Sequence, residues 1–113
     1  MSAVALKKRL RDELKAAMQA RATDEVRLLR TLIAALDNAE AVPSEPGPSA
    51  FRALGDPSGE VARLVLASEM VSAVLASEID ARLAAANDYA AHGRADDADR
   101  LHGKVALIRR YLA

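Results

Sequence analysis

Hydrophobic residues recur along this chain at three- and four-residue intervals, the spacing of one face of an α-helix. The first two such stretches predict helices over about residues 2–21 and 23–41. Two more predict helices over about 68–92 and 95–112. The apolar stripes are, in chain order, Leu6, Leu10, Leu14, Ala17 and Met18; Val26, Leu28, Leu29, Leu32, Ile33 and Leu36; Val71, Val74, Leu75, Ile79, Leu83 and Ala86; and Ala98, Leu101, Val105, Ile108 and Leu112.

A proline- and glycine-rich segment separates the second and third predicted helices. All four prolines and three of the five glycines lie between Pro43 and Gly59. Because proline lacks a backbone N–H and biases the preceding residue towards extended geometry, we expect a mobile loop over residues 43–59. It is either a tolerated surface insertion, the simpler interpretation, or a partner-binding segment. Residues 61–66 fit either a helical turn or an extended lead-in, and we favour a mostly extended or single-turn connector.

The connections between the other helices are short. Gly93 is suited to a left-handed C-cap after the third helix. Connections of a few residues force neighbouring helices to run antiparallel. We therefore expect an all-α fold: a compact antiparallel bundle of four main helices in a single domain over residues 1–113.

Composition narrows the class of protein. The 113 residues include 26 alanines, which favour closely packed helices, and only three aromatic residues. The absence of cysteine excludes disulfides, thiolate zinc sites and thiol nucleophiles, and agrees with a reducing compartment. The N-terminus has no signal-like apolar segment, since charges begin at Lys7. No apolar run elsewhere in the sequence approaches the roughly 18 residues that a membrane-spanning helix needs. We expect a cytoplasmic protein that does not insert into membranes.

Charge is balanced overall but uneven along the chain. Residues 1–30 carry eight Lys or Arg against four Asp or Glu, and the remainder carries eight against twelve. A basic first helix can form a weak contact with phosphate or an acidic partner, but a solvated helix face is the simpler interpretation and the one we favour. The candidate phosphate contacts lie largely away from the first apolar stripe: Lys7, Lys8, Arg11 and Lys15.

No catalytic, cofactor-binding or metal-binding motif is evident. His92 and His102 fall on different predicted helices, without the i, i+3 or i+4 spacing of a helical ligand pair. The acids at 96, 97 and 99 open a helix, where the helix dipole already favours them. The same acids stand where a DNA-reading helix would need basic residues, so we expect no specific DNA binding.

Two sets of polar residues interrupt the apolar helices. Glu78 precedes Arg82 by four residues, the better order for an ion pair within a helix. Arg30 and Asn38 form a polar stripe on the otherwise apolar second helix. A charged side chain packed between helices needs a partner, and Glu78 is a candidate for Arg30. We favour a polar clasp between helices, and a ligand-binding groove is the alternative.

The spacing of these residues resembles that of the YqeY family, which is related to the tail of the tRNA-dependent amidotransferase B subunit. The resemblance covers most of the chain except the proline-rich segment. Its more specific elements are Arg30 with Asn38, and Tyr89 with Gly93-Arg94; Glu78, Arg82 and the terminal Tyr111-Leu112 also match. It adds Tyr89 and Arg94 to the candidate clasp or groove, which comprises Arg30, Asn38, Glu78, Arg82, Tyr89 and Arg94.

The resemblance implies a link to tRNA and its amidation, with two departures. Members of the family usually continue past Tyr-Leu-Pro into a small helical module similar to the part of the B subunit that contacts tRNA, whereas this sequence stops at Ala113. Lys104 stands where an acid is expected. We therefore expect a non-catalytic accessory or interaction protein with a possible protein partner and at most weak tRNA binding. The alternative is a component or vestige of a glutamine-dependent amidotransferase, although no glutaminase nucleophile or ATP motif is present.

Overall fold

The computed structural model describes residues 2–41 and 57–112, and the side chains of residues 2–40 and 67–112. Within these ranges the chain forms four helices and no strand, so the predicted all-α class is confirmed. It divides into two compact units, 1–71 and 72–113, which are described separately below. Of the predicted loop over residues 43–59, the part from 43 to 56 lies outside the described residues.

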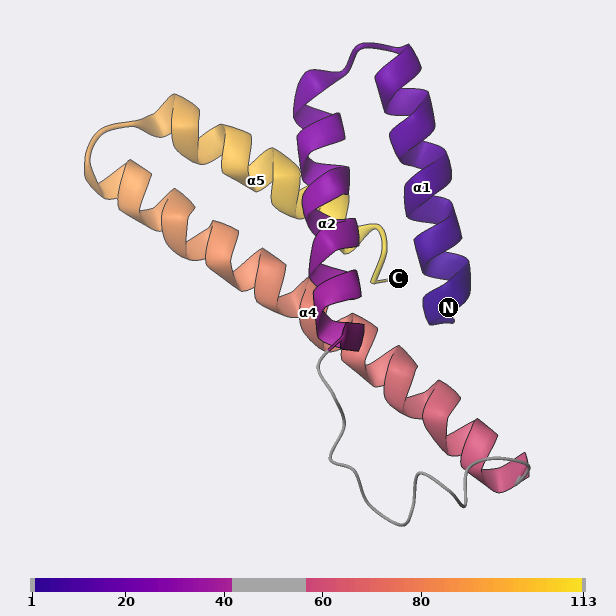
Figure 1. Ribbon diagram of the computed structural model, residues 1–113. Coiled ribbons are helices and arrows are strands. Elements are labelled where there is room, and N and C mark those ends of the chain that lie inside the picture. Colours follow the sequence, from indigo (N-terminus) through magenta and orange to yellow (C-terminus); the bar gives the residue numbers. More distant parts are fainter. Residues whose placement is uncertain (1, 42–56, 113) are drawn as a thin grey trace. The chain divides into compact units, whose positions relative to one another are not determined.

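The first two helices form an antiparallel hairpin (Figure 1). Helix α1 spans Ala3–Gln19, and the Ser2 hydroxyl caps it by accepting a hydrogen bond from the Ala5 N–H at 3.1 Å. Helix α2 spans Thr23–Ala41 and carries two acids in its first turn. Both features satisfy or complement the free N–H groups at a helix start. The predicted bounds of these helices agree with the structure to within two residues.

The turn between α1 and α2 is a Schellman motif, in which two backbone N–H groups bond back to the last turn of the helix. The Ala22 N–H donates to the Ala17 carbonyl at 3.0 Å, and the Arg21 N–H to the Met18 carbonyl at 3.2 Å. Arg21 takes the left-handed position at φ 56°, which usually belongs to glycine. The same motif ends α4, where the Arg94 N–H bonds to the Tyr89 carbonyl at 2.8 Å and Gly93 has φ 74°. The predicted left-handed cap at Gly93 is confirmed.

The two turns predict stability changes of opposite sign. Arg21→Gly should raise the free energy of unfolding by about 1 kcal/mol, because a Cβ is strained in the left-handed region and the Arg21 side chain is exposed. Gly93→Ala should lower it by about 1 kcal/mol. A Cβ built at Gly93 meets no atom within 4 Å, so the cost comes from the backbone alone. Urea denaturation measures both; a stabilising Gly93→Ala would contradict this account of the turns.

The buried apolar residues of α1 and α2 follow the predicted stripes with one correction. Leu10, Leu32 and Leu36 are fully buried, and the others are Leu6, Ala17, Leu28 and Leu29. Met18 was expected on the buried face of α1, but half of it (51%) is exposed. Next to the turn, the smaller Ala17 takes the buried position and Met18 points outward.

Helix α4 begins earlier than predicted. It spans Pro57–Ala91, so residues 61–66 are helical and not an extended connector, and the predicted start at Ser68 is wrong. Proline is tolerated in the first turn of a helix, where its missing N–H would have no helical partner. Pro57 therefore opens the helix. The end of the predicted loop, residues 57–59, belongs to α4.

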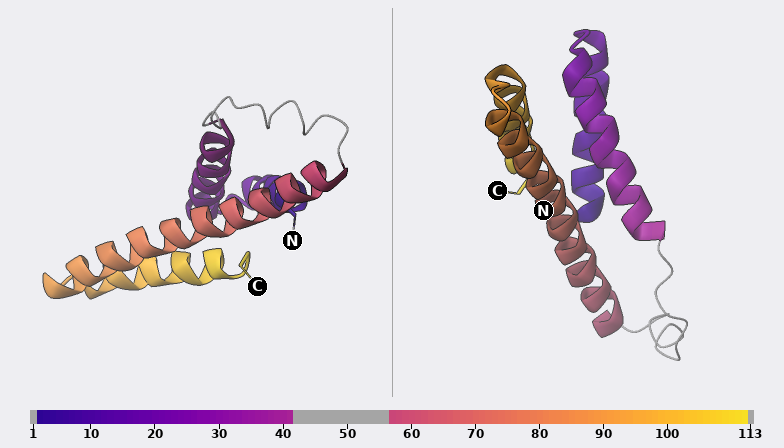
Figure 2. Two further views of the ribbon diagram at one scale, coloured as in Figure 1. Left: turned by 90° about the horizontal axis from the view of Figure 1, so that it is seen from below. Right: turned by 90° about the vertical axis from the view of Figure 1, so that its left-hand side faces the viewer.

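In the second unit, α5 runs back alongside the C-terminal part of α4 (Figure 2). Helix α5 spans Ala95–Arg109 and buries Ala98, Val105 and Ile108, as the predicted stripe requires. The helix ends three residues earlier than predicted. Beyond it, the backbone N–H of Tyr111 donates to the Ile108 carbonyl at 3.0 Å, and the backbone N–H of Leu112 donates to the Arg109 carbonyl at 3.1 Å. Each bond joins residues three apart, as in a 3₁₀ turn. Because a 3₁₀ turn has fewer residues per turn than an α-helix, the side chains after Arg109 point in different directions from those of a continued α-helix. Tyr111 is therefore buried, whereas Leu112, which was expected in the stripe, is 41% exposed.

Candidate functional site

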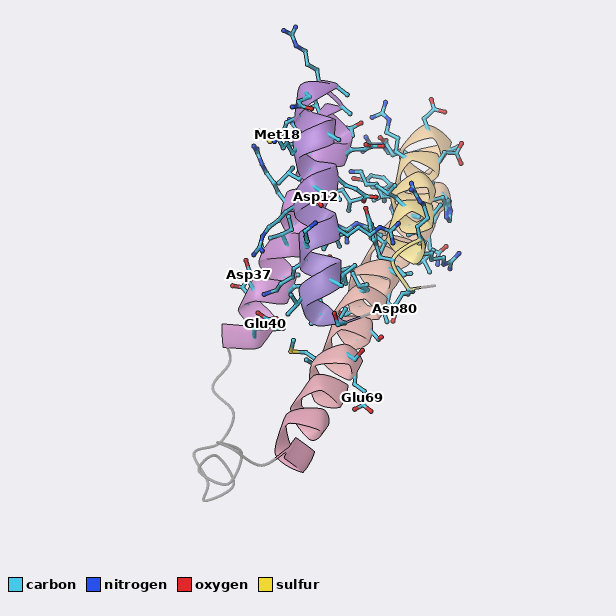
Figure 3. All side chains as sticks on the ribbon, turned by 90° about the vertical axis from the view of Figure 1, so that its right-hand side faces the viewer. Asp12, Met18, Asp37, Glu40, Glu69 and Asp80 are labelled. Carbon is cyan, nitrogen blue, oxygen red and sulfur yellow. The ribbon has the colours of Figure 1, made fainter. Side chains whose placement is uncertain are left out.

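Lys7 joins α1 to α2 through two carboxylates. Its amine lies 3.1 Å from Asp37 and also forms an ion pair and hydrogen bond with Glu40. Only 14% of the Lys7 side chain is exposed, whereas its partners are 51% and 38% exposed. Figure 3 labels Asp37 and Glu40 near the end of α2 that lies opposite the turn. We call these three residues the Lys7 clamp.

The clamp holds its lysine in the charged form. The hydrogen bond to Glu40 is the largest cause that raises the pKa of Lys7 above its ordinary value of 10.5. Burial of the amine acts in the opposite direction, and the hydrogen bond to Asp37 and the negative charges of both carboxylates raise the pKa further. A lysine that acts as a base or nucleophile needs the opposite shift. The clamp therefore has a structural role. Unlike the exposed Lys8, Arg11 and Lys15, Lys7 is largely covered and already paired with carboxylates of α2.

Removing the clamp should weaken the hairpin in a pH-dependent way. Lys7→Met is expected to lower the free energy of unfolding by about 1 kcal/mol near neutral pH. Because the pKa of Lys7 is raised in the folded state, this contribution is complete below 10.5, the unfolded value, and disappears as the pH rises through the folded pKa. Denaturant unfolding of wild type and variant at about pH 7, 9 and 11 measures the difference.

Lys8→Met is the matched control for this prediction. Lys8 pairs with Asp12 at 3.3 Å within α1, but the two side chains are 79% and 67% exposed. Exposed pairs of this kind contribute little to stability. Equal losses for Lys7→Met and Lys8→Met would contradict the assignment of a clamp.

A second contact joins the two helices near the turn. The Arg30 Nη2 group approaches the Met18 sulfur at 3.9 Å, and both side chains are exposed. Arg30 was predicted to pair with Glu78, which lies in the other unit; that pairing stays a prediction. Asn38 is exposed on α2.

The other three basic candidates lie on an exposed stripe of α1. Lys8, Arg11 and Lys15 are exposed, as is Val4 at 77%. Among the described residues, Lys8 has Asp12 as an ion-pair partner, while neither Arg11 nor Lys15 has one. Together with Met18 they define what we call the outward stripe: Val4, Lys8, Arg11, Lys15 and Met18.

The predicted pair on α4 forms. Arg82 donates to the Glu78 carboxylate at 2.6 Å and to the Glu78 carbonyl at 3.0 Å. Both side chains are largely covered, with 16% and 24% exposed. Because both partners lie on one helix, the contact stabilises α4 locally.

Tyr89 and Arg94 also meet, at the turn between α4 and α5. The Arg94 guanidinium lies over the Tyr89 ring at 5.0 Å and pairs with Asp97 at 2.7 Å. Arg100 lies 3.8 Å from the other oxygen of Asp97. These contacts link the last turns of α4 to the first turn of α5. A cation–π contact and an exposed ion pair account for the arrangement without a ligand.

The histidines lie outside any such cluster. The Nδ1 atom of His92 lies 2.7 Å from the Asp88 carbonyl, and both His92 and His102 are exposed. Within residues 2–41 and 57–112, no group of three or more His, Asp or Glu side chains is placed to hold a metal ion.

The partners of Lys7 are not evident from the sequence alone. Nothing local links Lys7 to Asp37 and Glu40, which lie 30 and 33 residues further along the chain. The available signal was the turn itself: once α1 and α2 are antiparallel, residues at similar distances from Arg21 meet. Asp97, which pairs with Arg94, was interpreted only as a residue that complements the helix dipole.

In the part of the chain that the structure describes, no helix combines the length and apolar character needed to cross a membrane. No protein-family model matches the chain, and no curated protein or solved structure is significantly similar to it.

Proposed function

We propose that this chain is a non-catalytic helical accessory protein that contacts its partner through the outward stripe of α1, in a process linked to tRNA amidation. The observation that carries the proposal is the set of exposed cations at the centre of that stripe. The link to tRNA amidation rests on the resemblance to the YqeY family, carried by residues such as Arg30, Asn38, Tyr89 and Arg94.

The charges of Arg11 and Lys15 are not explained by the stability of α1, whereas Lys8 pairs with Asp12 within the helix. Basic residues stabilise a helix in its last turn, and α1 has none there. Arg11 and Lys15 are like charges four residues apart, an arrangement that destabilises a helix slightly. An anionic partner would turn this cost into an attraction.

The polar contacts in the structure support a binding role over a catalytic one. Lys7 is held protonated by carboxylates. Glu78 and Arg82 neutralise each other within one helix, and Arg94 is engaged by Asp97 and Tyr89.

Affinity capture from the native lysate tests this function. The tagged full-length chain is compared with a Lys8→Gln, Arg11→Gln, Lys15→Gln variant, and the bound RNA and protein are identified by sequencing and mass spectrometry. We expect tRNA, amidotransferase subunits or both with the wild type and much less with the variant. Recovery of neither class would contradict the link to amidation, and equal recovery by both chains would contradict the role of the stripe.

The alternative is a component or vestige of a glutamine-dependent amidotransferase, in which a partner supplies the catalytic groups. The family resemblance favours it, and the capture experiment separates the two. If an amidotransferase co-purifies, its glutamine-dependent amidation rate is measured with and without the chain. A rate that depends on the chain supports the enzyme component, and an unchanged rate supports the accessory protein.

A further inference from the structure

The spacing of the outward stripe identifies a kind of partner. Its residues follow each other at intervals of four, three, four and three, which is the heptad spacing along which two helices pack in a left-handed coiled coil. From Val4 to Met18 the stripe is about 21 Å long at 1.5 Å per residue. The opposite side of α1 buries Leu6, Leu10 and Ala17.

The chemistry of the stripe is apolar at both ends and cationic between them. Val4 and Met18 are two of the four large hydrophobic residues that are exposed among the described residues. Lys8, Arg11 and Lys15 lie between them. Figure 3 labels Met18 near one end of α1 and Asp12, the partner of Lys8, near its middle.

We infer that the outward stripe docks an amphipathic acidic helix of a partner protein. That helix carries Glu or Asp opposite Lys8, Arg11 and Lys15, and apolar side chains opposite Val4 and Met18. The inference rests on the proposed function, because it names the partner of the same surface. It goes further in assigning the partner's structure and charge.

Two other occupants fit less well. A second copy of α1 would place its own three cations against the first set, and like charges at facing positions are repelled. A nucleic acid would use the cations but not the two apolar ends, since phosphate contacts are electrostatic. None of the chain's three aromatic residues lies on α1, so bases would have no ring there on which to stack.

A peptide titration tests the inference. The probe is a fluorescent synthetic helix of about three heptads with Leu, Glu, Glu, Glu and Leu along one stripe. A second peptide carries Lys in place of Glu, and a single-stranded RNA of similar charge is the third probe. We expect the acidic peptide to bind the full-length chain, with an affinity that falls as salt rises, and the basic peptide not to bind.

Variants separate the two parts of the stripe. Lys8→Gln, Arg11→Gln, Lys15→Gln should weaken binding of the acidic peptide about tenfold, and Val4→Ser, Met18→Ser should weaken it about fivefold. The control Arg27→Gln, Arg100→Gln, Arg110→Gln removes the same charge from exposed positions elsewhere and should leave the affinity within about twofold. Circular dichroism checks that each variant remains helical.

Three results would overturn the inference: no saturable binding of the acidic peptide up to about 1 mM, equal weakening by the control variant, or RNA binding that is tighter and insensitive to Val4→Ser, Met18→Ser. The capture experiment is independent of this outcome. If the peptide fails while lysate capture still depends on the stripe, the proposed function stands and only the acidic helix is rejected.

Discussion

Leu10→Ala should lower the free energy of unfolding by about 3 kcal/mol. Leu10 is fully buried, and it lies on the side of α1 that also buries Leu6 and Ala17. Truncation removes apolar contact area and leaves a cavity that the surrounding side chains fill only in part. For a chain of this size, such a loss is a large fraction of the total stability.

Met18→Ala is the control, because the hydrophobic spacing alone would place Met18 on the same buried face. Its side chain is 51% exposed, so we expect a loss of less than about 1 kcal/mol. Urea denaturation monitored by circular dichroism measures both variants. Similar losses for Leu10→Ala and Met18→Ala would contradict the observed orientation of α1.

Tyr111→Ala should destabilise the chain by about 3 kcal/mol, although Tyr111 lies beyond the last residue of α5. Its side chain is 5% exposed, and an aromatic ring buries a large apolar area. Leu112→Ala should cost less than about 1 kcal/mol, because Leu112 is 41% exposed.

This pair of variants distinguishes the structure from a simple continuation of the helix. A regular α5 that continued to residue 112 would bury Leu112 on the stripe of Val105 and Ile108. The same denaturation measurement therefore decides how the chain ends. If Leu112→Ala lowered the free energy of unfolding more than Tyr111→Ala, the chain would not form the tight turn after Arg109.

The helices were predictable because their interiors follow a single periodicity. Leu6 and Leu10 on α1, and Leu32 and Leu36 on α2, lie where helical spacing places them. Prediction failed where the backbone departs from that periodicity. The winding changes at Tyr111. Met18 is a different case, because it lies within α1, at the edge of the apolar stripe, and next to Ala17, which takes the buried position.

Local preferences also misled at two backbone positions. Pro57 was interpreted as part of a helix-breaking segment, although proline also suits a helix start. Arg21 adopts a left-handed backbone conformation, which is usually predicted only where the sequence has a glycine. Tyr89 and Arg94, which the family resemblance added to the candidate clasp or groove, lie close together in the structure. The Lys7 clamp required knowledge of the hairpin, because its residues are far apart in the chain.

The reactivity of the four lysines tests the central claim, that the outward stripe of α1 is the surface that contacts the partner. Lys8 and Lys15 belong to the stripe, Lys7 to the clamp, and Lys104 lies half-buried on α5. In the free chain an amine-reactive reagent should modify Lys8 and Lys15 rapidly. Lys7 should react slowly, because its ion pairs raise its pKa and cover its amine.

The decisive comparison is between the free chain and the complex captured from lysate, with modification at each lysine quantified by fragment-ion mass spectrometry. The account predicts that Lys8 and Lys15 become several-fold less reactive in the complex, while Lys7 and Lys104 keep their free-state rates. Unchanged rates at Lys8 and Lys15 together with protection of Lys104 would contradict it, because the partner would then contact α5 and not the stripe.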